Sequence, residues 1–471
     1  MTSPEEIEGQ NGEGGGYGGG DRDRDEGKES RGEDEREDEA EQTFELKAHC
    51  LCQTHTFTAT VPRTSLPLAA SYCHCTSCRH VTGALYSSVV PWPANGAAAV
   101  RASSLRRYVF SATMAILYCG VCGSTMFAER RGADAGAGAE GGREGDEEGG
   151  AEGKGSDTLH YAVQTGVLVN AAVRRLLTIA HHMFLSDTLD GGASPWLCSD
   201  SLPPRLWAGR RGESEELSPT THHWPAVQQQ RAGPAPPEIP IRCHCGGVDL
   251  VLRPPAAYFA TQPRASLPWF VDPASNKSLA GFDACDSCRL SSGSDVFHWT
   301  FVLLRHLGFP SKTQSQSTSP SPSDEPAFPA SSIELRNAVP TTSTSKAAEG
   351  TKTEADADPR WGTLTFHASS PDVQRYFCAR CSASVFYAAD DRPELVDLAI
   401  GLLHSTDGSR AESLLSWDFG GRMVWRGDVA GGWREAFVEG VEAAAERWRI
   451  GRGYPKNWRR VQKEEAARAR R

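Results

Sequence analysis

The sequence predicts a mainly β protein with two tandem, cysteine-rich domains, flanked by disordered tails and interrupted by loop insertions. Three observations lead to this fold class. Polar low-complexity stretches divide the chain, and the segments between them consist mostly of short runs typical of β-strands. The cysteine motifs occur in the same order in two parts of the chain. The length of 471 residues is typical of about two to four domains.

The β prediction depends on runs such as "TFTATV", "LYSSVV", "LRRYVF", "TLTFH" and "SVFYA". They are rich in aromatic and β-branched residues, often alternate with polar residues, and are bounded by Gly, Pro or Ser, as strands are. Helical signals are sparse. The strongest is "REAFVEGVEAAAERWR" at 434–449, where apolar residues recur at helical spacing.

Polar, low-complexity segments divide the chain. Residues 1–42 are acidic and Gly-rich, and we expect them to be disordered because they bury too little apolar surface to offset the loss of conformational entropy. The segments 131–157 and 310–357 are predicted to be surface-loop insertions. A Pro/Gln-rich stretch, 210–238, is the expected linker. The basic segment 451–471 is interpreted as a solvated tail.

An internal repeat sets the domain boundaries. "HCLCQTHTFTATV", "CHCTSCRHVTGALYSS" and "YCGVCGSTMFAE" occur in this order in the first part of the chain. "RCHCGGVDLVL", "DACDSCRLSSGSDVFHW" and "FCARCSASVFYAA" follow in the same order in the second part. We therefore expect one domain over 43–209 and a similar domain over 239–450.

Composition excludes several classes of protein. The formal net charge of −11 argues against a dedicated nucleic-acid binder. There is no run of about 18 apolar residues and no secretory signal pattern, so we expect a soluble, intracellular protein without membrane contact, with cytoplasm and nucleus undecided. In a reducing compartment, 14 cysteines indicate metal binding rather than disulfides.

The first repeat offers two groups of thiols. Close pairs such as C-x-C and C-x-x-C place two sulfurs on one turn, and two pairs complete a tetrahedral zinc site. The pairs are Cys50, Cys52, Cys119 and Cys122. The remaining trio is Cys73, Cys75 and Cys78. It would hold a second zinc with one position open for chemistry. The sequence equally permits closure of that position by His74, His80 or a distant carboxylate, and redox use of the C-x-x-C pairs.

The second repeat keeps one group and changes the other. The four-thiol set is Cys243, Cys245, Cys378 and Cys381. The trio becomes Asp283, Cys285 and Cys288. A carboxylate can bind zinc but does not reproduce a third thiolate, so Asp283 is either a tentative ligand or an ordinary loop residue. Cys198 lies outside both repeats and is expected to behave as a small hydrophobe.

The ordered motifs C-x-C, C-H-C-x-x-C-R-x-x-x-G and C-x-x-C-G resemble the glutathione-dependent formaldehyde-activating enzyme family, whose domain is also called the centromere-protein-V domain. "SYCHCTSCRHVTGALY", "YAVQTGVL" and "AHHMFLSDTLDGGASPWL" carry this resemblance, which spans both repeats. Gln53, in place of a glycine after the first C-x-C, and Asp283 depart from the family pattern.

The resemblance implies an Mss4-like β fold, with a structural zinc on the four-thiol set and a catalytic zinc on the trio. It implies a carbon–sulfur lyase that joins formaldehyde to glutathione, or a related small thiol, as S-(hydroxymethyl)glutathione synthase does. Arg79 could steady a substrate carboxylate or form a local salt bridge. Because Asp283 breaks the second trio, the first repeat is the expected active copy.

The alternative function is a non-catalytic zinc scaffold whose tails recruit protein partners that the sequence does not identify. Other conspicuous residues receive no functional role. We expect His181 and His182 to be packed or on the surface, and Tyr118 and Phe377, which precede the last cysteine pairs, to lie in the core.

Overall fold

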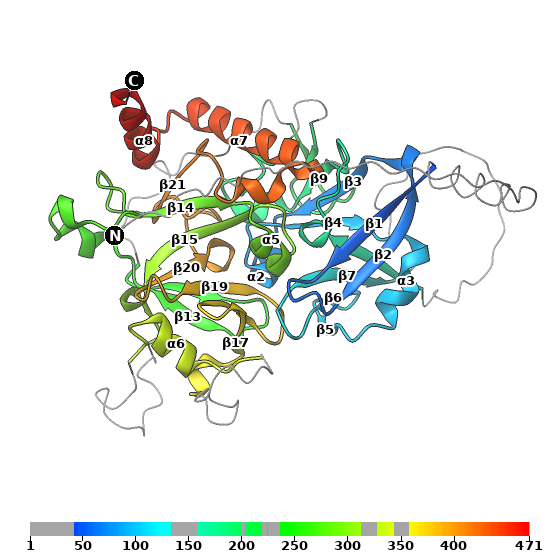
Figure 1. The fold of residues 1–471 in the computed structure, drawn as a ribbon, viewed down its shortest axis with the longest axis horizontal. Coiled ribbons are helices and arrows are strands. Elements are labelled where there is room, and N and C mark those ends of the chain that lie inside the picture. Colours follow the sequence, from blue (N-terminus) through cyan, green and yellow to red (C-terminus); the bar gives the residue numbers. More distant parts are fainter. Residues whose placement is uncertain are drawn as a thin grey trace, which may run out of the picture.

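A computed structural model describes the fold for residues 42–132, 158–198, 203–218, 224, 236–311, 327–342 and 358–470. Nearly all of the predicted disordered segment 1–42, most of the insertion 131–157 and most of the linker 210–238 lie outside these residues. We refer to the described residues of 42–218 as the first half and those of 236–470 as the second half. Figure 1 shows the first half in blue to teal and the second in green to red.

A large sheet and a separate hairpin form the first half. The hairpin joins β1 (Thr43–His49) to β2 (Thr56–Pro62). The sheet strands, in spatial order, are β11 (Glu216–Leu217), β10 (Arg205–Trp207), β9 (Leu177–Met183), β3 (Leu68–Cys73), β4 (Ser87–Pro91), β8 (Leu159–Gln164), β7 (Thr125–Arg131), β6 (Met114–Tyr118) and β5 (Arg106–Val109). Short helices α2 (Thr76–Thr82) and α3 (Ala94–Arg101) accompany them.

The second half contains a small and a large sheet. The small one pairs β12 (Ile239–Arg242), β13 (Asp249–Leu252) and β16 (Leu307–Gly308). The large one has the order β17 (Leu364–Ser370), β18 (Val373–Cys378), β19 (Ser384–Ala389), β20 (Leu395–Ala399), β15 (Phe297–Leu303), β14 (Ser278–Asp283) and β21 (Leu415–Trp417). The helices are α4 (Ala256–Ala260), α5 (Asp286–Ser292), α6 (Ser332–Ala338), α7 (Trp433–Gly451) and α8 (Trp458–Ala469).

The two large sheets share one strand order. Reading from the parallel pair, the first is β9-β3-β4-β8-β7-β6-β5 and the second is β21-β14-β15-β20-β19-β18-β17. In the first sheet, β3, which leads into the second cysteine motif, pairs in parallel with β9. In the second sheet, β14 leads into the corresponding motif and pairs in parallel with β21. The mainly β fold predicted from the sequence is therefore confirmed, with two β regions of matching topology.

Alternating and helical patterns explain the individual elements. In β2, Phe57, Ala59 and Val61 are buried while the residues between them are exposed, as expected for a half-buried strand. The predicted helix over 434–449 is found as α7, whose buried residues include Val438 and Val441 at helical spacing. Such apolar faces hold both elements on the core.

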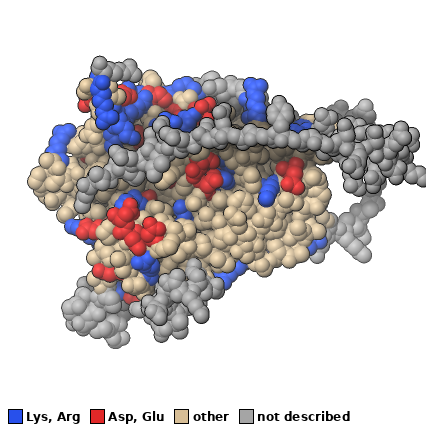
Figure 2. All heavy atoms as spheres, in the orientation of Figure 1, with Lys and Arg blue, Asp and Glu red and all other residues tan. Residues whose placement is uncertain are grey.

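One prediction about an irregular segment was wrong. Part of the predicted insertion 310–357 forms α6, which is capped by Ser331 and held on the core by the fully buried Leu335. The basic segment 451–471, predicted to be a solvated tail, forms α8, which begins with Asn457 as its capping residue and has no buried residue. Basic side chains gather over α8 on the face drawn in Figure 2. Within the described residues, no helix has the length and apolar character needed to cross a membrane.

Reciprocal contacts join the halves. The Gly166 amide donates to Gly293 O at 2.9 Å, and the Gly401 amide donates to Gly83 O at 3.0 Å. Gly83 and Gly293 end helices α2 and α5 with φ of +80° and +79°, a conformation that favours glycine. A Cβ on Gly83 would also lie 2.2 Å from Ser384 O. The close approach of the two halves therefore depends on these glycines.

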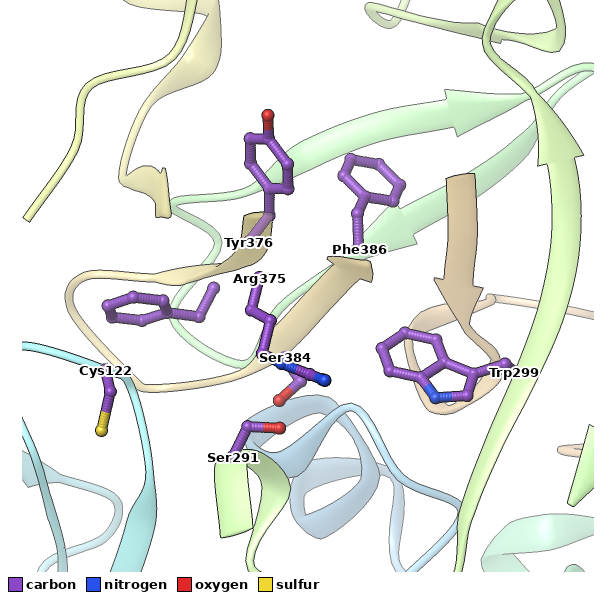
Figure 3. A pocket seen from close by; sticks show the side chains of 8 residues that line it. Cys122, Ser291, Trp299, Arg375, Tyr376, Ser384 and Phe386 are labelled. Atoms are coloured by element: carbon purple, nitrogen blue, oxygen red, sulfur yellow. The ribbon is translucent and has the colours of Figure 1, made fainter. Parts of the chain in front are cut away.

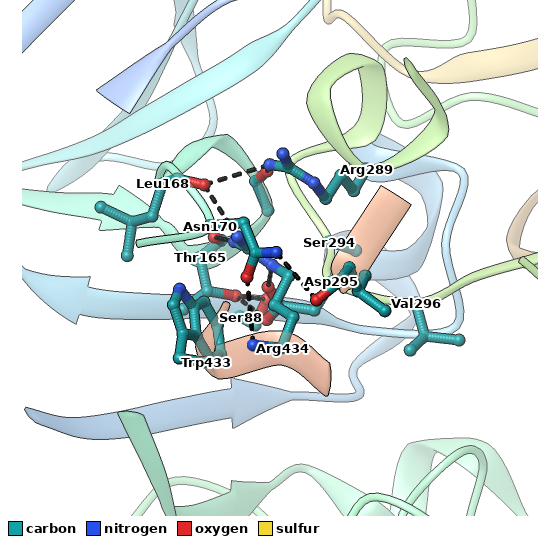
Figure 4. Close-up of polar contacts among 12 residues, drawn as sticks. Ser88, Thr165, Leu168, Asn170, Arg289, Ser294, Asp295, Val296, Trp433 and Arg434 are labelled. Carbon is teal, nitrogen blue, oxygen red and sulfur yellow. Dashed lines mark hydrogen bonds and ion pairs between the residues drawn. The ribbon is translucent and has the colours of Figure 1, made fainter. Parts of the chain in front are cut away.

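A buried ion pair strengthens the same interface (Figure 4). Arg434 Nε on α7 lies 2.9 Å from Asp295 Oδ1, and both side chains are 0 % exposed. Arg434 also donates to Leu168 O at 2.9 Å and Thr165 O at 2.6 Å, while Asp295 accepts from the Tyr72 hydroxyl at 3.3 Å. Because α7 reaches carbonyls of the first half through a fully buried charge, the two halves form one packed unit.

Candidate metal centres

Each half brings four cysteine thiols together. The first cluster is Cys50, Cys52, Cys119 and Cys122, and the second is Cys243, Cys245, Cys378 and Cys381. In each, the sulfurs lie within 4.8 Å of one another, and the two sulfurs of the C-x-C pair lie 3.5 Å apart. A zinc ion with four sulfurs at about 2.3 Å would space them by about 3.8 Å, so both donor sets fit tetrahedral zinc.

The same construction positions both sets. One pair lies where the opening strand of the half ends, and the other pair lies on the turn between two sheet strands. Backbone amides point at the sulfurs: the amides of His55 and Val248 donate to Cys50 Sγ and Cys243 Sγ at 3.3 and 3.2 Å. Such bonds favour thiolates, which are the form that binds metal.

Within each cluster, hydrogen bonds between neighbouring thiols shift the pKa values of the cysteines. Hydrogen bonds from Cys119, Cys122 and Cys50 lower the pKa of Cys52. In the second half, hydrogen bonds from Cys243, Cys378 and Cys381 lower the pKa of Cys245. Neighbouring thiols also lower the pKa of Cys122 and Cys378 to about 7, so each cluster carries two thiols that ionise readily. All 14 cysteines are described, and none of them is joined in a disulfide.

The residue after each cysteine pair adopts a left-handed conformation. In the first half, Gln53 has φ of +59° and Gly123 has +76°. In the second half, Gly246 has φ of +70° and Ser382 has +69°. Each half thus keeps glycine at one of its two left-handed positions and places a side chain at the other. Gln53 replaces the glycine of the family pattern. The fold tolerates this replacement because the strain is confined to the backbone of Gln53 itself.

The trio of the first half forms a third cluster. Cys73 ends β3, Cys75 is the N-terminal cap of α2, and Cys78 lies in its first turn. Cys73 and Cys75 sulfurs lie 3.5 Å apart, and the Cys78 amide donates to Cys75 Sγ at 3.2 Å. Hydrogen bonds from the Cys73 and Cys78 thiols lower the pKa of Cys75 to about 3. These residues fit a three-thiolate zinc site.

Among the described residues, no fourth His, Cys, Asp or Glu joins this trio. The two histidines that the sequence offered as closing ligands are engaged elsewhere. His74 Nε2 lies 2.8 Å from His182 Nδ1, and His182 Nε2 lies 2.6 Å from Leu197 O. The His80 ring packs on His404 with a centroid separation of 4.3 Å. Within the described part of the chain, the fourth coordination position of such a site therefore has no protein ligand.

The second trio differs in chemistry as well as in sequence. Asp283 Oδ1 accepts from the Cys285 amide at 2.7 Å, and the Cys288 thiol donates to Asp283 Oδ2 at 3.4 Å. Burial raises the pKa of Asp283. The guanidinium of Arg375 lies beside the cluster, with Nη1 3.5 Å from Cys288 Sγ. Arg375 lies three positions before Cys378 of the four-thiol cluster. The corresponding residue of the first half, three positions before Cys119, is the buried Ile116 rather than an arginine.

Figure 3 shows Arg375 among the residues that line a small cavity, together with Ser291 and Ser384. The cavity volume is about 10 Å³, close to that of one water molecule. This cavity is therefore too small for a substrate.

A larger cleft of about 260 Å³ opens beside the first trio. Its lining residues are Thr76, Arg79, His80, Asp187, Thr188, Leu189, Leu403, His404, Ser405, Gly408 and Ser409. Arg79 is only 5 % exposed and donates to His74 O at 3.3 Å and Thr76 Oγ1 at 3.1 Å. The surface salt bridge that the sequence permitted for Arg79 does not form, because the side chain is buried and its hydrogen bonds go to a carbonyl and a hydroxyl, while Asp190 and Asp187 act on it only at longer range.

The remaining predicted residues are packed as expected. His182 and His181 are buried, as are Tyr118 and Phe377. The Tyr118 hydroxyl also donates to Ala379 O of the second half at 2.7 Å. Cys198 is partly exposed, outside all four clusters, and its thiol contacts Pro195 O at 3.6 Å.

Sequence reasoning missed Arg375, Asp187 and His404. These residues lie far along the chain from the cysteines that they approach. Asp187 lies within the segment "AHHMFLSDTLDGGASPWL" that carries part of the resemblance, and this segment was a signal for it. The signal for Arg375 was the charge change between the residues before "FCARC" and "YCGVC" in the two repeats.

Comparison with known proteins gives one match. The family model described as "Glutathione-dependent formaldehyde-activating enzyme" matches residues 45–148, which include the first four-thiol set and the first trio. No curated protein and no solved structure matches the chain. The first half thus contains a domain of this family, and the second half contains a β region with a similar four-cysteine cluster.

Proposed function

We propose that the chain is a zinc-binding enzyme of the carbon–sulfur lyase type, which adds formaldehyde to glutathione or a related small thiol in its first half. The observation that carries this proposal is the trio Cys73, Cys75 and Cys78, which has no fourth protein ligand and lies next to an open polar cleft. The family match over 45–148 supports the choice of reaction.

The cysteines assign the metal positions. Each four-thiol cluster would hold a structural zinc, since its thiols are mostly buried and complete a tetrahedron. The trio would hold the reactive zinc, which supplies the Lewis acidity that lowers the pKa of a thiol at its open position. The amide of Cys78 and the helix N-terminus that Cys75 caps stabilise negative charge on the Cys75 sulfur.

The addition is balanced without an oxidant or a reductant. The substrate thiol loses its proton, its sulfur forms a bond to the formaldehyde carbon, and the carbonyl π electrons move to the oxygen. The proton ends on this oxygen, which gives a hydroxymethyl thioether. Arg79 and the neighbouring polar groups hold the remainder of the thiol in the cleft, and this positioning reduces the entropy cost of the encounter.

We also propose that the second half is a second, degenerate copy of the same domain. The shared strand order, the parallel pair at the same place in each sheet and the repeated cysteine spacing support this assignment. Its trio has Asp283 in place of a cysteine, so catalysis is assigned to the first half. Fourteen free thiols fit a reducing, intracellular compartment.

The test is direct. Zinc-loaded protein is mixed with glutathione and ¹³C-formaldehyde, and adduct formation is followed by NMR exchange against the uncatalysed rate. We expect acceleration by the wild type, loss of acceleration in Cys75→Ser, and retention in the matched variant Cys285→Ser. Absence of acceleration in folded wild type with zinc bound would reject the reaction and leave the zinc scaffold as the function.

A further inference from the structure

The open cleft is built by both halves of the chain. Thr76, Arg79 and Asp187 line it from the first half, and His404 and Ser409 line it from the second. A ligand in the cleft would therefore contact residues more than 300 positions apart, although the trio beside it belongs to the first half alone.

The repeat places a corresponding position on the other side of the interface. Cys73 and Asp283 occupy the same position of the repeat. Cys73 is paired in parallel with Met183, and Asp283 is paired in parallel with Val424. The ten residues after Met183 therefore correspond to the ten residues after Val424. The residues after both partners, Phe184 and Trp425, are left-handed, which confirms this register. Counted onward, the segment 191–193 (Gly, Gly, Ala) corresponds to 432–434 (Gly, Trp, Arg).

This second position is filled by its own chain. Trp433 Nε1 donates to Val169 O at 3.2 Å, and Arg434 Nη1 donates to Leu168 O at 2.9 Å. Leu168 and Val169 correspond to Leu403 and His404, counted from the paired amides of Gly166 and Gly401. Trp433 and Arg434 thus reach the segment of Leu168 and Val169 with bulky side chains, whereas Gly192 and the fully buried Ala193 stand at the corresponding positions of the first half.

The corresponding arginines of the filled position and the open cleft also differ in their charged partners. In the filled one, Arg289 pairs with Asp286 at 2.8 Å and donates to Gly166 O at 2.7 Å. In the open one, Arg79 corresponds to Arg289, but Thr76 stands where the aspartate would be. Among the described residues, no carboxylate lies within ion-pair distance of Arg79. Asp190 and Asp187 act on Arg79 only at longer range, so its buried guanidinium, which lines the cleft, has no direct ion pair and can form one with an anionic ligand.

We propose that the cleft binds the amino-carboxylate end of a small thiol. The ligand carboxylate pairs with Arg79, its ammonium group lies toward Asp187, and the second half supplies the opposite wall through His404 and Ser409. Placing the ligand sulfur at the trio rests on the proposed function, whereas recognition of the charged end does not. The degenerate half therefore acts as a binding wall for the active half.

S-Methylglutathione is a suitable probe, because it keeps the charged groups but has no thiol to react. Its binding to the zinc-loaded full chain is measured by isothermal titration calorimetry. We expect saturable binding to the wild type, weakened about tenfold or more by Arg79→Met. His404→Ala, at the partly exposed wall, should weaken it severalfold, and the matched control His160→Ala should not.

The outcomes separate the two proposals. Binding with this dependence but no formaldehyde adduct would reject the proposed reaction and retain the cleft. Adduct formation together with no saturable binding of S-methylglutathione would overturn the cleft. Equal affinity of the wild type, Arg79→Met and His404→Ala would overturn it as well.

A separate observation concerns metal content. We infer that the Asp283–Cys285–Cys288 cluster holds no zinc, because Arg375 already supplies its positive charge. Nη1 of Arg375 lies 3.5 Å from Cys288 Sγ, and the side chain is buried in contact with the cluster. A divalent ion beside this guanidinium would meet like-charge repulsion, and the Asp283 carboxylate already accepts hydrogen bonds at both oxygens.

Restoring the donors of the first half tests this inference. We expect Asp283→Cys combined with Arg375→Ile to bind one zinc more per chain than the wild type, measured by elemental analysis of reduced protein. The single variant Asp283→Cys, which keeps the arginine, should gain less. A folded double variant with an unchanged zinc content would overturn the inference, as would four zinc ions in the wild type.

Discussion

The two halves share a strand order and a four-thiol cluster but differ wherever chemistry could occur. The first half has a three-cysteine cluster, an open cleft and a buried arginine without a direct ion pair. The second half has an aspartate in the cluster, an arginine beside it, and Trp433 and Arg434 at the positions of Gly192 and Ala193. These differences are coordinated. The half whose cluster contains the aspartate also supplies the bulky residues that hold the two halves together.

The largest effect is expected where the halves are alike. Cys119→Ser and Cys378→Ser remove corresponding members of the four-thiol clusters, so each should lose one zinc. Because structural zinc binding contributes about 10 kcal/mol in small domains, each should lower the free energy of unfolding by about 5 kcal/mol or more. Zinc analysis and denaturant unfolding measure this, with Cys198→Ser as a control. Unchanged zinc in either variant would break the equivalence.

The next effect concerns the filled position of the second half. Arg434→Met leaves Asp295 buried without its cation, and this should lower the free energy of unfolding by about 3–5 kcal/mol. The control Lys456→Met breaks an exposed pair with Glu464 and should change it by less than about 1 kcal/mol. Equal effects, measured by urea unfolding, would show that the interface does not depend on the buried pair.

Converting the first trio into the second sharpens the comparison further. Cys73→Asp with Ile116→Arg reproduces the donor set and the cation of the second half. We expect the loss of one zinc and of the catalysed adduct formation, while the zinc ions of the four-thiol clusters stay bound. Elemental analysis and the NMR assay measure both. An unchanged zinc content in the folded variant would mean that these two residues do not decide metal binding.

The smallest effect concerns the left-handed positions after the cysteine pairs, where one half has glycine and the other half has a different residue. Gln53→Gly should raise the free energy of unfolding by about 0.5–1 kcal/mol, because the strain removed exceeds the added flexibility of the unfolded chain. Ser382→Gly should gain less, since it also loses the hydroxyl contact with Thr125 at 2.9 Å. Thermal unfolding of zinc-loaded protein distinguishes them, and a destabilised Gln53→Gly would contradict the strain argument.

The sequence alone determined the β fold and the grouping of the cysteines. Short alternating runs predict strands because side chains alternate across a sheet, and C-x-C or C-x-x-C pairs place two sulfurs on one turn whatever the rest of the chain does. The helix at 434–449 followed from its apolar spacing for the same local reason. Polar composition misled the prediction for α6, because a capping serine and one buried leucine suffice for a short helix.

Only the tertiary structure decided what surrounds each trio. Packing places Arg375 beside Cys288, His404 across from Arg79, and Arg434 in the position that corresponds to the open cleft. These contacts join residues separated by between 87 and 325 positions, and no local pattern encodes such distances. The identity of a metal ligand is local chemistry that the sequence displays, whereas the charge and the space around it are set by which distant segments the fold brings together.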